Sequence, residues 1–592
     1  MVLKKNIYAN LFLFTVSMKY RLSPRFWVFG IHGFLFLTGI VFSVWGDTLP
    51  SDRRVTHPAP KPLVLVSPDS PRTDENIRLR IVTYNDFHGS FREKNISIGA
   101  AKFVTALDQY KDAYPKDYPT AVGVLSVGDN FSGTALSYYS MYEMRTDKGN
   151  KACPLENFFI RTGTLLSCIG NHEFDWEPNF FADHLSRSTV RLGRRRFHVY
   201  SSSNVTMKET ALPPGGIPSY DMLEIPEIGF KIAVLTLTTM ETPQKTTEGA
   251  TADYLFEKPA EAAKRLLPRI PNADAVLFVA HLSSYQDADG NVTFGRETED
   301  MLELVRLKPM AIISAHSHRF VSGQVEDVPI IQAGCYANGL ASLNFIIDPA
   351  TKKIELESRE TIDLRPRRES LHPDPVMEKI VADAQTLCDF TRIGTVREDM
   401  PSDRRRLTDI GVLISKAVAT TFRDKTGEEP VLGFQHSGGI RSNFSKGDIT
   451  QEDCYDMLPF QGGETLCRLS GDEIVRLMRE GFVNPVGYLQ SFGLTFHYDK
   501  SDAPKQDFMK ITFRHRDREI PIEPDKKYWA VIDSFIVAGG DGFSTDIFEG
   551  NVVVPKGPQS RDVLIRYCRN DLNGDIGIDE KDRLKFVVES KE

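Results

Sequence analysis

Residues 164–175 read TLLSCIGNHEFD, an apolar run that ends in glycine, asparagine, histidine and two carboxylates. A short, continuous apolar run bounded by polar residues is typical of a strand that is buried on both faces. Similar runs occupy residues 77–84, 121–127, 231–238, 275–280 and 311–315. Helix-like stretches lie between several of them, at residues 100–114 and 257–270 for example. This alternation of strands and helices predicts an α/β layer architecture.

Polar residues with metal-ligand chemistry follow these predicted strands one after another. Sites in open α/β sheets form at the carboxyl ends of the strands, so side chains far apart in sequence can converge there. A carboxylate can bridge two cations about 3.5–4 Å apart. Because the set mixes nitrogen and oxygen donors without thiolates, it suits zinc or manganese at a reactive site rather than a structural zinc knot. In chain order the set is Asp86, His88, Asp129, Asn171, His281, His316 and His318.

The order D-x-H, G-D, G-N-H-E, H and H-x-H resembles the calcineurin-like metallophosphoesterases over about residues 78–345. The resemblance implies a four-layer domain, a β-sandwich flanked by helices, that holds two divalent metal ions. Zinc is the metal we expect, with manganese or cobalt as alternatives. His172 and Asp175 fit the family's catalytic dyad, in which the ring stabilises the charge of the transition state for phosphoryl transfer and the carboxylate orients the ring. One metal would be held by Asp86, His88, Asp129 and His318, and the other by Asp129, Asn171, His281 and His316.

Five blocks between residues 391 and 560 resemble the second domain of the 5′-nucleotidases, a smaller mixed α/β nucleoside-binding domain. They are GGIR at 438–441, KGDIT at 446–450, DMLPFQGGETLCRLSGDEI at 456–474, YLQSFGL at 488–494 and AGGDGF at 538–543. The resemblance implies that Arg441 reaches the phosphate or ribose and that Tyr488 and Phe543 sandwich the base. Arg404 is the best match for a second substrate arginine, and Arg405 and Arg406 compete with it. His436 stands where the family commonly has an asparagine that contacts the base, so no base preference is assumed.

The composition is that of an ordinary globular chain. The 592 residues are 41% apolar and 26% charged, and the net charge of −8 gives no electrostatic footprint for a nucleic acid polymer. Seven cysteines leave at least one thiol unpaired, and neither their pairing nor the oligomeric state follows from the sequence. The expected order is an N-terminal basic stretch with an apolar segment (1–46), a Pro-rich stalk (47–76), the catalytic domain (77–361), a linker and helix (362–390), the substrate-binding domain (391–568) and a polar tail (569–592).

The segment from Phe26 to Trp45 is 20 residues of almost unbroken apolar sequence that follows a basic flank. That length matches a membrane span, and the flank favours a cytoplasmic N-terminus. We expect an uncleaved signal-anchor, with a cleaved signal peptide and a buried core helix as the alternatives. The first two place the catalytic part outside the cytosol, as a type II membrane protein or a secreted one. Acceptor sequons, which weakly support a glycoprotein, begin at Asn95, Asn130, Asn204, Asn291 and Asn443.

These features together predict a dinuclear-metal phosphohydrolase that removes phosphate from nucleoside 5′-monophosphates outside the cytosol. The resemblance to the 5′-nucleotidases implies that the second domain holds the nucleoside and rotates to deliver it. A related hydrolase with another ester is the first alternative: a 2′,3′-cyclic phosphodiesterase, a UDP-sugar hydrolase or an apyrase-like di- or triphosphatase. A non-catalytic nucleotide-binding surface protein is the second alternative, but it predicts lost metal ligands, and none is missing.

Overall fold

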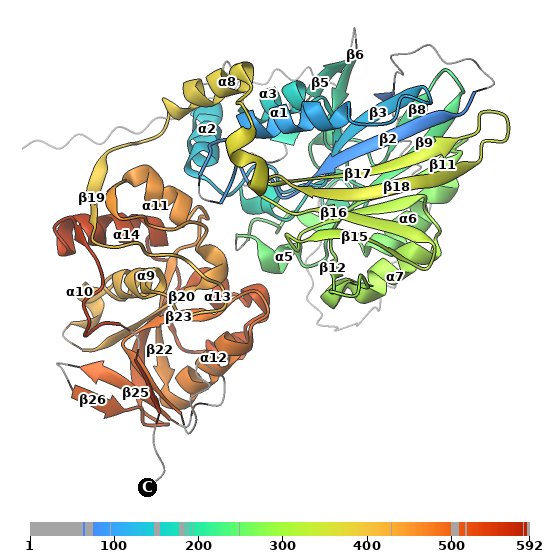
Figure 1. Cartoon of the computed structure of the whole chain (residues 1–592). Helices are drawn as coiled ribbons and strands as arrows, with labels where there is room; N and C mark the ends of the chain where they lie inside the picture. The colour runs from blue at the N-terminus through green and yellow to red at the C-terminus, as the bar shows by residue number, and fades with distance from the viewer. Residues whose placement is uncertain are drawn as a thin grey trace, which may run out of the picture. The chain divides into compact units, whose positions relative to one another are not determined.

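Two β-sheets face each other in the N-terminal half of this computed structural model (Figure 1). The structure describes residues 63–65, 75–94, 96–146, 154–176, 181, 184–185, 189–192, 195–247, 249–427, 429–498, 508, 510–515, 518–583 and 585–588. The first sheet has the order β18-β17-β2-β3-β4, and β2, β3 and β4 are parallel. Its strands are β18 (Ile354–Asp363), β17 (Gly339–Ile347), β2 (Ile77–Tyr84), β3 (Thr120–Ser126) and β4 (Thr164–Ser167).

The second sheet has seven strands in the order β1-β8-β9-β11-β14-β16-β15, with a parallel centre from β9 to β16. Apolar side chains from both sheets fill the space between them, which explains why these strands are continuous apolar runs. The strands are β1 (Leu63–Val64), β8 (Asp221–Ile225), β9 (Phe230–Thr238), β11 (Ala275–Ser283), β14 (Ala311–Ala315), β16 (Val328–Ala333) and β15 (Phe320–Val325).

Helices cover the outer face of each sheet. On the five-stranded sheet lie α1 (Ala100–Lys111), α3 (Pro154–Thr162) and α8 (Pro375–Gln385), which share one core with the strands. On the seven-stranded sheet lie α6 (Pro259–Leu266) and α7 (Thr298–Arg306). The layers are therefore helix, sheet, sheet and helix, and the four-layer prediction is confirmed. The predicted linker helix is α8, which Asp374 caps by accepting from the Met377 amide at 2.8 Å.

The C-terminal half is a mixed α/β domain built on a five-stranded sheet of order β23-β20-β27-β22-β28. Its strands are β23 (Leu489–Phe492), β20 (Val431–His436), β27 (Lys527–Asp533), β22 (Glu464–Ser470) and β28 (Val552–Val554). Two smaller sheets adjoin it: β21 (Gly447–Thr450), β19 (Arg392–Val396) and β29 (Asp575–Ile576), then β26 (Arg518–Pro521), β25 (Lys510–His515), β24 (Leu494–Tyr498) and β30 (Lys585–Val588). The main helices are α9 (Asp409–Ala419), α11 (Gln451–Met457), α12 (Gly471–Val483) and α14 (Ser560–Arg566).

Three predictions about the ends and the surface of the chain are wrong in part. The stalk does not extend through Leu63, which is buried and pairs with β8. The tail is not merely polar, because β29 and β30 pair with β19 and β24. The sequon residues Asn130 and Asn204 are buried and hydrogen-bonded, so neither is a surface acceptor.

The predicted apolar segment Phe26–Trp45 lies outside the described residues. Within the residues that the structure does describe, no helix combines the length and the apolar character needed to cross a membrane. The six described cysteines carry free thiols, and five of them are buried.

Candidate active site

The ends of β2, β3, β4 and β14, together with a residue inside β11, bring all seven predicted metal ligands together. Five of the seven are non-glycine residues with a left-handed backbone: Asp86, His88, Asp129, His316 and His318. That conformation is uncommon outside glycine, and a cluster of such residues marks a region where the fold enforces local strain. His281 differs from the prediction in a detail, because β11 continues through it to Ser283 instead of ending before it.

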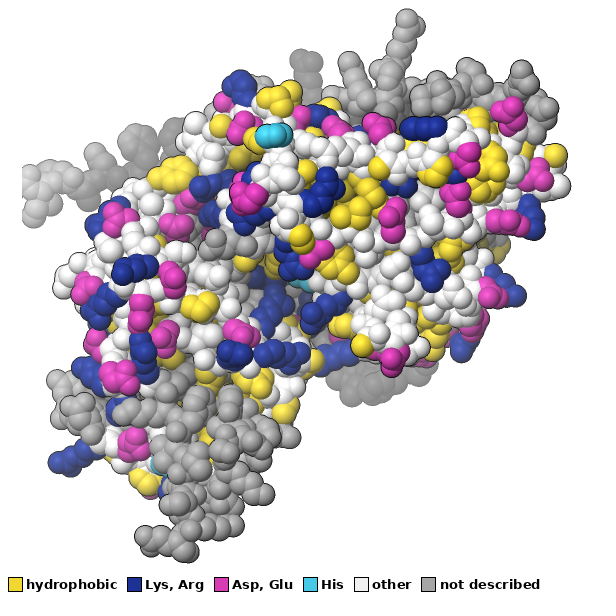
Figure 2. All heavy atoms as spheres, in the orientation of Figure 1, with side chains coloured by type: hydrophobic (Ala, Val, Ile, Leu, Met, Phe, Trp, Pro, Cys, Tyr) yellow, Lys and Arg dark blue, Asp and Glu magenta, His cyan; other side chains and the backbone are white. Residues whose placement is uncertain are grey.

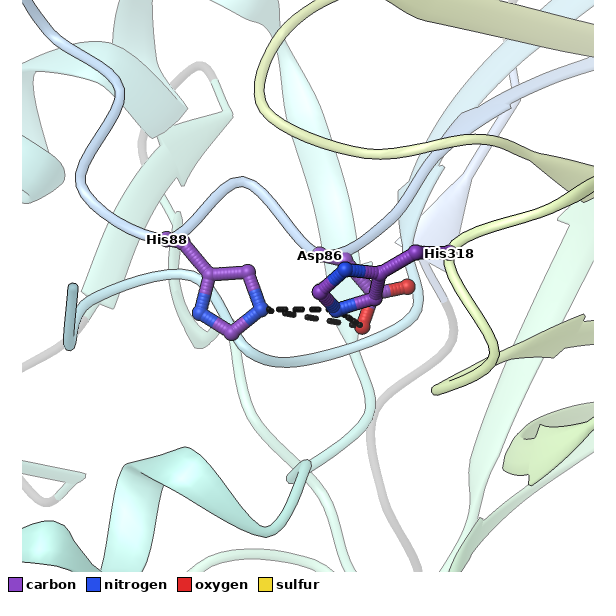
Figure 3. A group of neighbouring side chains, drawn as sticks. All are labelled: Asp86, His88 and His318. Atoms are coloured by element: carbon purple, nitrogen blue, oxygen red, sulfur yellow. Dashed lines mark hydrogen bonds and ion pairs between the residues drawn. The ribbon is translucent and has the colours of Figure 1, made fainter. Parts of the chain in front are cut away.

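One group of ligand atoms comes from Asp86, His88 and His318 (Figure 3). The Nε2 atoms of His88 and His318 lie 3.1 Å apart. Oδ1 of Asp86 lies 3.4 Å from Nε2 of His318 and 3.9 Å from Nε2 of His88. The three side chains therefore aim one nitrogen or oxygen each at a common point, as in the first predicted metal site.

Asp129 connects this group to a second one. Its Oδ2 atom lies 3.7 Å from Nε2 of His88 and 3.2 Å from Nε2 of His281. His281 and His316 complete the second group with Asp129, and Oδ1 of Asn171 lies 3.2 Å from Nε2 of His281. A single carboxylate oxygen thus faces both groups, which is the geometry that a bridging ligand requires.

The hydrogen bonds of Asp86 and Asp129 use only one oxygen of each carboxylate. Asp86 accepts from Asn85 and from the His316 amide through Oδ2, and Asp129 accepts from the His172 amide through Oδ1. The other oxygen of each carboxylate is buried and has no hydrogen-bond partner among the described residues. A buried carboxylate oxygen without a partner is costly unless a cation compensates it. The residues present therefore fit a pair of divalent metal ions.

Two of the histidines are held in the tautomer that a metal needs. Nδ1 of His88 lies 3.0 Å from the Ser132 carbonyl, and Nδ1 of His281 lies 2.6 Å from the Val127 carbonyl. Each ring can donate its Nδ1 proton to that carbonyl, so Nε2 carries the free lone pair. Burial lowers the pKa of His281, but the Asp129 carboxylate beside it raises that pKa to about 10. A metal bound here must therefore displace a proton from His281.

Glu173 has a structural task in the loops of the site. Its carboxylate accepts from the backbone amides of Asp129, Asn130 and Gly170 at 2.7–2.9 Å. It thereby ties the loop after β3 to the loop after β4, the two loops that carry Asp129 and Asn171. The position of Glu173 directly after the histidine of G-N-H-E was the available signal.

His172 and Asp175 form the predicted pair. Nδ1 of His172 lies 2.8 Å from Oδ2 of Asp175, and the Thr246 hydroxyl donates to the other Asp175 oxygen at 2.7 Å. Burial lowers the pKa of His172, while the carboxylates of Asp175 and Asp129 raise it above its ordinary value. Nε2 of His172 points away from Asp175 and lies 3.3 Å from Nη2 of Arg441.

A cavity of about 450 Å³ joins these residues to the C-terminal domain, and both His172 and Arg441 line it. Figure 2 shows Lys and Arg side chains gathered around a hollow in the face that it presents. Arg404 also lines the cavity, and within the described part of the chain its guanidinium makes no ion pair. Burial and the nearby Arg441 lower the pKa of Arg404. Neither Arg404 nor Arg441 forms an ion pair among the described residues, so both guanidinium groups can bind an anion in the cavity.

The side-chain partners of Arg404, Arg405 and Arg406 distinguish the three residues. Arg405 donates to the Asn484 and Pro485 carbonyls, although it too reaches the cavity wall. Arg406 is 80% exposed and pairs with Asp403. Arg404 is therefore the residue of the run whose guanidinium remains available to a substrate.

The predicted aromatic sandwich of Tyr488 and Phe543 does not face this cavity. Phe543 is 4% exposed and belongs to the hydrophobic core, and Tyr488 packs on that core beside Phe482. The phenyl rings that line the cavity are Phe460 and Phe535. Phe460 belongs to the LPFQGG block, and its place in that block was the available signal.

Phe460 connects the two domains at the site. Its ring stacks on that of His172 at 5.0 Å between centroids, and the Arg441 guanidinium lies 4.9 Å from the Phe460 centroid. His436 also lines the cavity, with Nδ1 3.3 Å from Oδ2 of Asp541, and its Nε2 is buried without a partner among the described residues. Lys245 of α5 (Thr242–Lys245) pairs with Asp541 at 2.5 Å and so joins the catalytic domain to the GGDG turn.

Comparison with known proteins agrees with this geometry. The family model described as calcineurin-like phosphoesterase matches residues 79–320, and the model described as 5′-nucleotidase, C-terminal domain, matches residues 392–548. The chain belongs to the calcineurin-like phosphoesterases that carry a 5′-nucleotidase C-terminal domain. This phosphoesterase is accordingly a metal-dependent phosphoester hydrolase.

Similar proteins differ widely in their names. The chain is 24% identical over 548 residues to an apyrase of Aedes aegypti, and the match covers 83% of this chain and 89% of that relative. It is 22% identical over 542 residues to endonuclease YhcR of Bacillus subtilis, where the match covers 87% of this chain but 41% of the relative. The solved 5′-nucleotidase precursor of Thermus thermophilus is 21% identical with a TM-score of 0.64, covering 86% of this chain and all of that one. Such similarity establishes the fold and leaves the substrate open.

Proposed function

We propose that this phosphoesterase removes the phosphate from nucleoside 5′-monophosphates. The observation that carries the proposal is the shared cavity, because the metal-ligand groups of one domain and the guanidinium groups of Arg404 and Arg441 of the other line the same space. A phosphate monoester has a dianionic end and a leaving nucleoside, and it fits between a cationic centre and a second domain that holds the nucleoside.

We assign two divalent ions to the two ligand groups. Asp86, His88 and His318 hold the first, Asn171, His281 and His316 hold the second, and Asp129 touches both. When bound, such ions polarise phosphate oxygens as Lewis acids and make a water molecule nucleophilic at neutral pH. Zinc suits the mixed imidazole and oxygen ligands, with manganese and cobalt as the alternatives.

His172 and Asp175 act on the phosphate as a pair. Asp175, fixed by Thr246, holds the Nδ1 proton of the ring, so Nε2 of His172 faces the cavity. A protonated His172 stabilises the charge that spreads over the phosphate oxygens in the transition state. Arg441 approaches the same position from the other domain, and its guanidinium can donate to phosphate oxygens there.

The nucleoside lies against the C-terminal domain in this proposal. Phe460 and Phe535 provide aromatic surface for a base, a contact worth about 1–3 kcal/mol per base. His436, held by Asp541, offers its free Nε2 to the base edge. Tyr488 and Phe543 then support the pocket from the core instead of touching the substrate.

We place the activity outside the cytosol, anchored by the Phe26–Trp45 segment. Support comes from the basic flank and length of that segment and from a relative, 22% identical over 555 residues, named cell wall protein Lmo0130 of Listeria monocytogenes. N-terminal sequencing of the mature protein and carbonate extraction of membranes test the anchor. A mature start after Gly46 would replace the anchor with a cleaved signal.

The test of the reaction is a substrate panel with the purified full chain and added Zn²⁺ or Mn²⁺. We expect phosphate release from AMP, UMP and CMP that is lost on chelation. The panel also contains UDP-glucose and 2′,3′-cyclic AMP, the substrates of the alternative hydrolases. Arg441→Ala should raise KM for AMP, whereas Arg367→Ala, an exposed residue that bonds Gln109, serves as the matched control. Turnover of UDP-glucose or the cyclic nucleotide without any turnover of monophosphates would overturn the proposal.

A further inference from the structure

A second cavity opens beside the candidate metal ligands, on the catalytic domain alone. It measures about 390 Å³ and shares Tyr285, His318 and Arg319 with the main cavity, so the two spaces meet at a metal ligand. No described residue of the C-terminal domain lines it, and it therefore leads away from the part of the site that holds the nucleoside. A water molecule takes about 30 Å³ of liquid volume, so the space is far larger than a water site needs.

The side chains of this second cavity select an anion. Among its described lining residues none is acidic, whereas Arg319 and Arg365 contribute two guanidinium groups. Asp363 already binds Arg365 through both carboxylate oxygens at 2.6–3.0 Å. Arg319, in contrast, makes no side-chain hydrogen bond or ion pair within the part of the chain that the structure describes, and its side chain is exposed to the cavity. An arginine without a side-chain partner among the described residues, next to a candidate phosphate site, can bind a further phosphate group.

Tyr285 and Gly295 shape the boundary between the two cavities. Tyr285 lines both spaces and is 39% exposed. Its ring lies over Gly295, where a Cβ atom would come within 3.1 Å of the ring, so the glycine lets the ring lie back against the loop. The polar atoms of Gln286 and Asn338, by comparison, are already bonded to backbone groups. Arg319, the Nη1 atom of Arg365 and the Tyr285 hydroxyl are lining groups whose donors have no partner among the described residues, and of the two arginines only Arg319 also borders the main cavity.

We propose that this cavity is a subsite for the terminal phosphate of a nucleoside triphosphate. The inference rests on the proposed function. In both proposals the nucleoside lies on the C-terminal domain, and the leaving group lies between the attacked phosphorus and that domain. The β-phosphate then occupies the position that the phosphate of AMP takes, and the γ-phosphate extends past His318 to Arg319. A triphosphate bound in this way is cleaved between its α- and β-phosphates.

The reaction that follows balances with water alone. A water oxygen forms a bond to the β-phosphorus, and the bond from that phosphorus to the oxygen shared with the α-phosphate breaks. The electron pair leaves on the α-phosphate, so ATP and water give AMP and pyrophosphate, and the proton released goes to solvent. A terminal phosphatase working in steps gives ADP and phosphate instead.

Two ATP analogues separate these routes, with AMP as the reference substrate. In β,γ-methylene-ATP the terminal bond cannot be hydrolysed, yet the proposed route still releases AMP and methylenebisphosphonate. In α,β-methylene-ATP the proposed bond is blocked, while a terminal phosphatase still releases phosphate. We expect the full metal-loaded chain to convert the first analogue and to leave the second intact. The reverse pattern, or inertness of both analogues while AMP is hydrolysed, overturns the subsite; absence of AMP hydrolysis overturns the proposed function instead.

Substitution of Arg319 tests the residue behind the inference. Arg319→Ala should lower kcat/KM for β,γ-methylene-ATP about tenfold more than it lowers kcat/KM for AMP, the loss expected for one charge-assisted hydrogen bond. Arg319→Lys should restore part of the kcat/KM lost for β,γ-methylene-ATP. Arg367 lines neither cavity, so Arg367→Ala should leave the ratio of kcat/KM for β,γ-methylene-ATP to kcat/KM for AMP at its native value. An equal loss on both substrates overturns the assignment of Arg319 to a separate phosphate.

Discussion

His172 illustrates how much of this site depends on single atoms. Its Nδ1 is tied to Asp175 and its Nε2 faces Arg441 across the cavity. We predict that His172→Ala and Asp175→Asn both lower kcat for AMP while KM changes little, because the ring acts mainly on transition-state charge. A loss of about 10²–10³-fold is typical when one such donor is removed. Steady-state kinetics decide this, and a rise in KM with unchanged kcat would show that the ring only binds the substrate.

The arginine run gives a second prediction with an internal control. Arg404 faces the cavity without an ion pair among the described residues, whereas Arg406 is 80% exposed. Arg404→Ala should therefore lower kcat/KM for AMP by about 10–100-fold, the cost of about 1.5–3 kcal/mol for a hydrogen bond to a charged group. Arg406→Ala should retain the native value. Equal losses of kcat/KM in the two variants would show that Arg404 does not contact the substrate.

The base pocket shows where residue-level prediction from sequence fails. The seven predicted metal ligands and the predicted dyad lie at or near strand ends in spaced motifs, so the sequence alone could indicate that they lie close together. Tyr488 and Phe543 also lie in motifs, but a motif does not say on which side of a strand or turn a ring emerges. In the structure Phe543 is buried in the core and the partly buried Tyr488 packs against it, while Phe460 and Phe535 line the cavity.

At the scale of elements, the strands were predictable and the ends of the chain were not. The central strands of both sheets are continuous apolar runs, so the sequence marks them clearly. Strand β1 is only Leu63–Val64 within a proline-rich stretch, and β29 is Asp575–Ile576 within a polar one. Such short strands owe their pairing to the sheet edge that receives them, which local composition cannot reveal.

Strand β8 carries a buried acid that makes stability depend on pH. Burial raises the pKa of Asp221 to about 7. The folded state holds the Asp221 proton more tightly than the unfolded chain does. The contribution of Asp221 to the free energy of unfolding is therefore complete below a pH of about 4 and decreases as the pH rises to about 7. Between pH 5.5 and 7.5 the loss amounts to about 2 kcal/mol, at 1.36 kcal/mol per unit of pKa.

We predict that Asp221→Asn removes this part of the pH dependence. The melting temperature of the variant should change less between pH 5.5 and 7.5 than that of the native chain, as calorimetry at both values can measure. Asp289→Asn, in an exposed turn, provides the matched control. The prediction fails if Asp221→Asn and Asp289→Asn show the same dependence on pH.

At the scale of the whole molecule, metal binding and folding should be coupled. The catalytic domain closes around Asp86 and Asp129, which are at most 1% exposed and each keep one carboxylate oxygen without a partner among the described residues. Without cations the two buried carboxylates depend on protons held by neighbouring rings such as His281, whose pKa the Asp129 carboxylate raises to about 10. A divalent ion displaces such a proton and supplies more charge at the same place. The native state thus binds metal in a way that the unfolded chain cannot, and this difference stabilises it.

Chelation should therefore destabilise the protein as well as inactivate it. A ligand present at 100 times its Kd contributes about 2.7 kcal/mol, which corresponds to a fall of about 5–10 °C in the melting temperature of a domain this large. We expect EDTA to produce such a fall in calorimetry and Zn²⁺ to reverse it. In Asp129→Asn the bridging charge is absent, so the metal-free protein should melt closer to the metal-loaded one. If chelation leaves the native melting temperature unchanged, the two ligand groups do not hold metal.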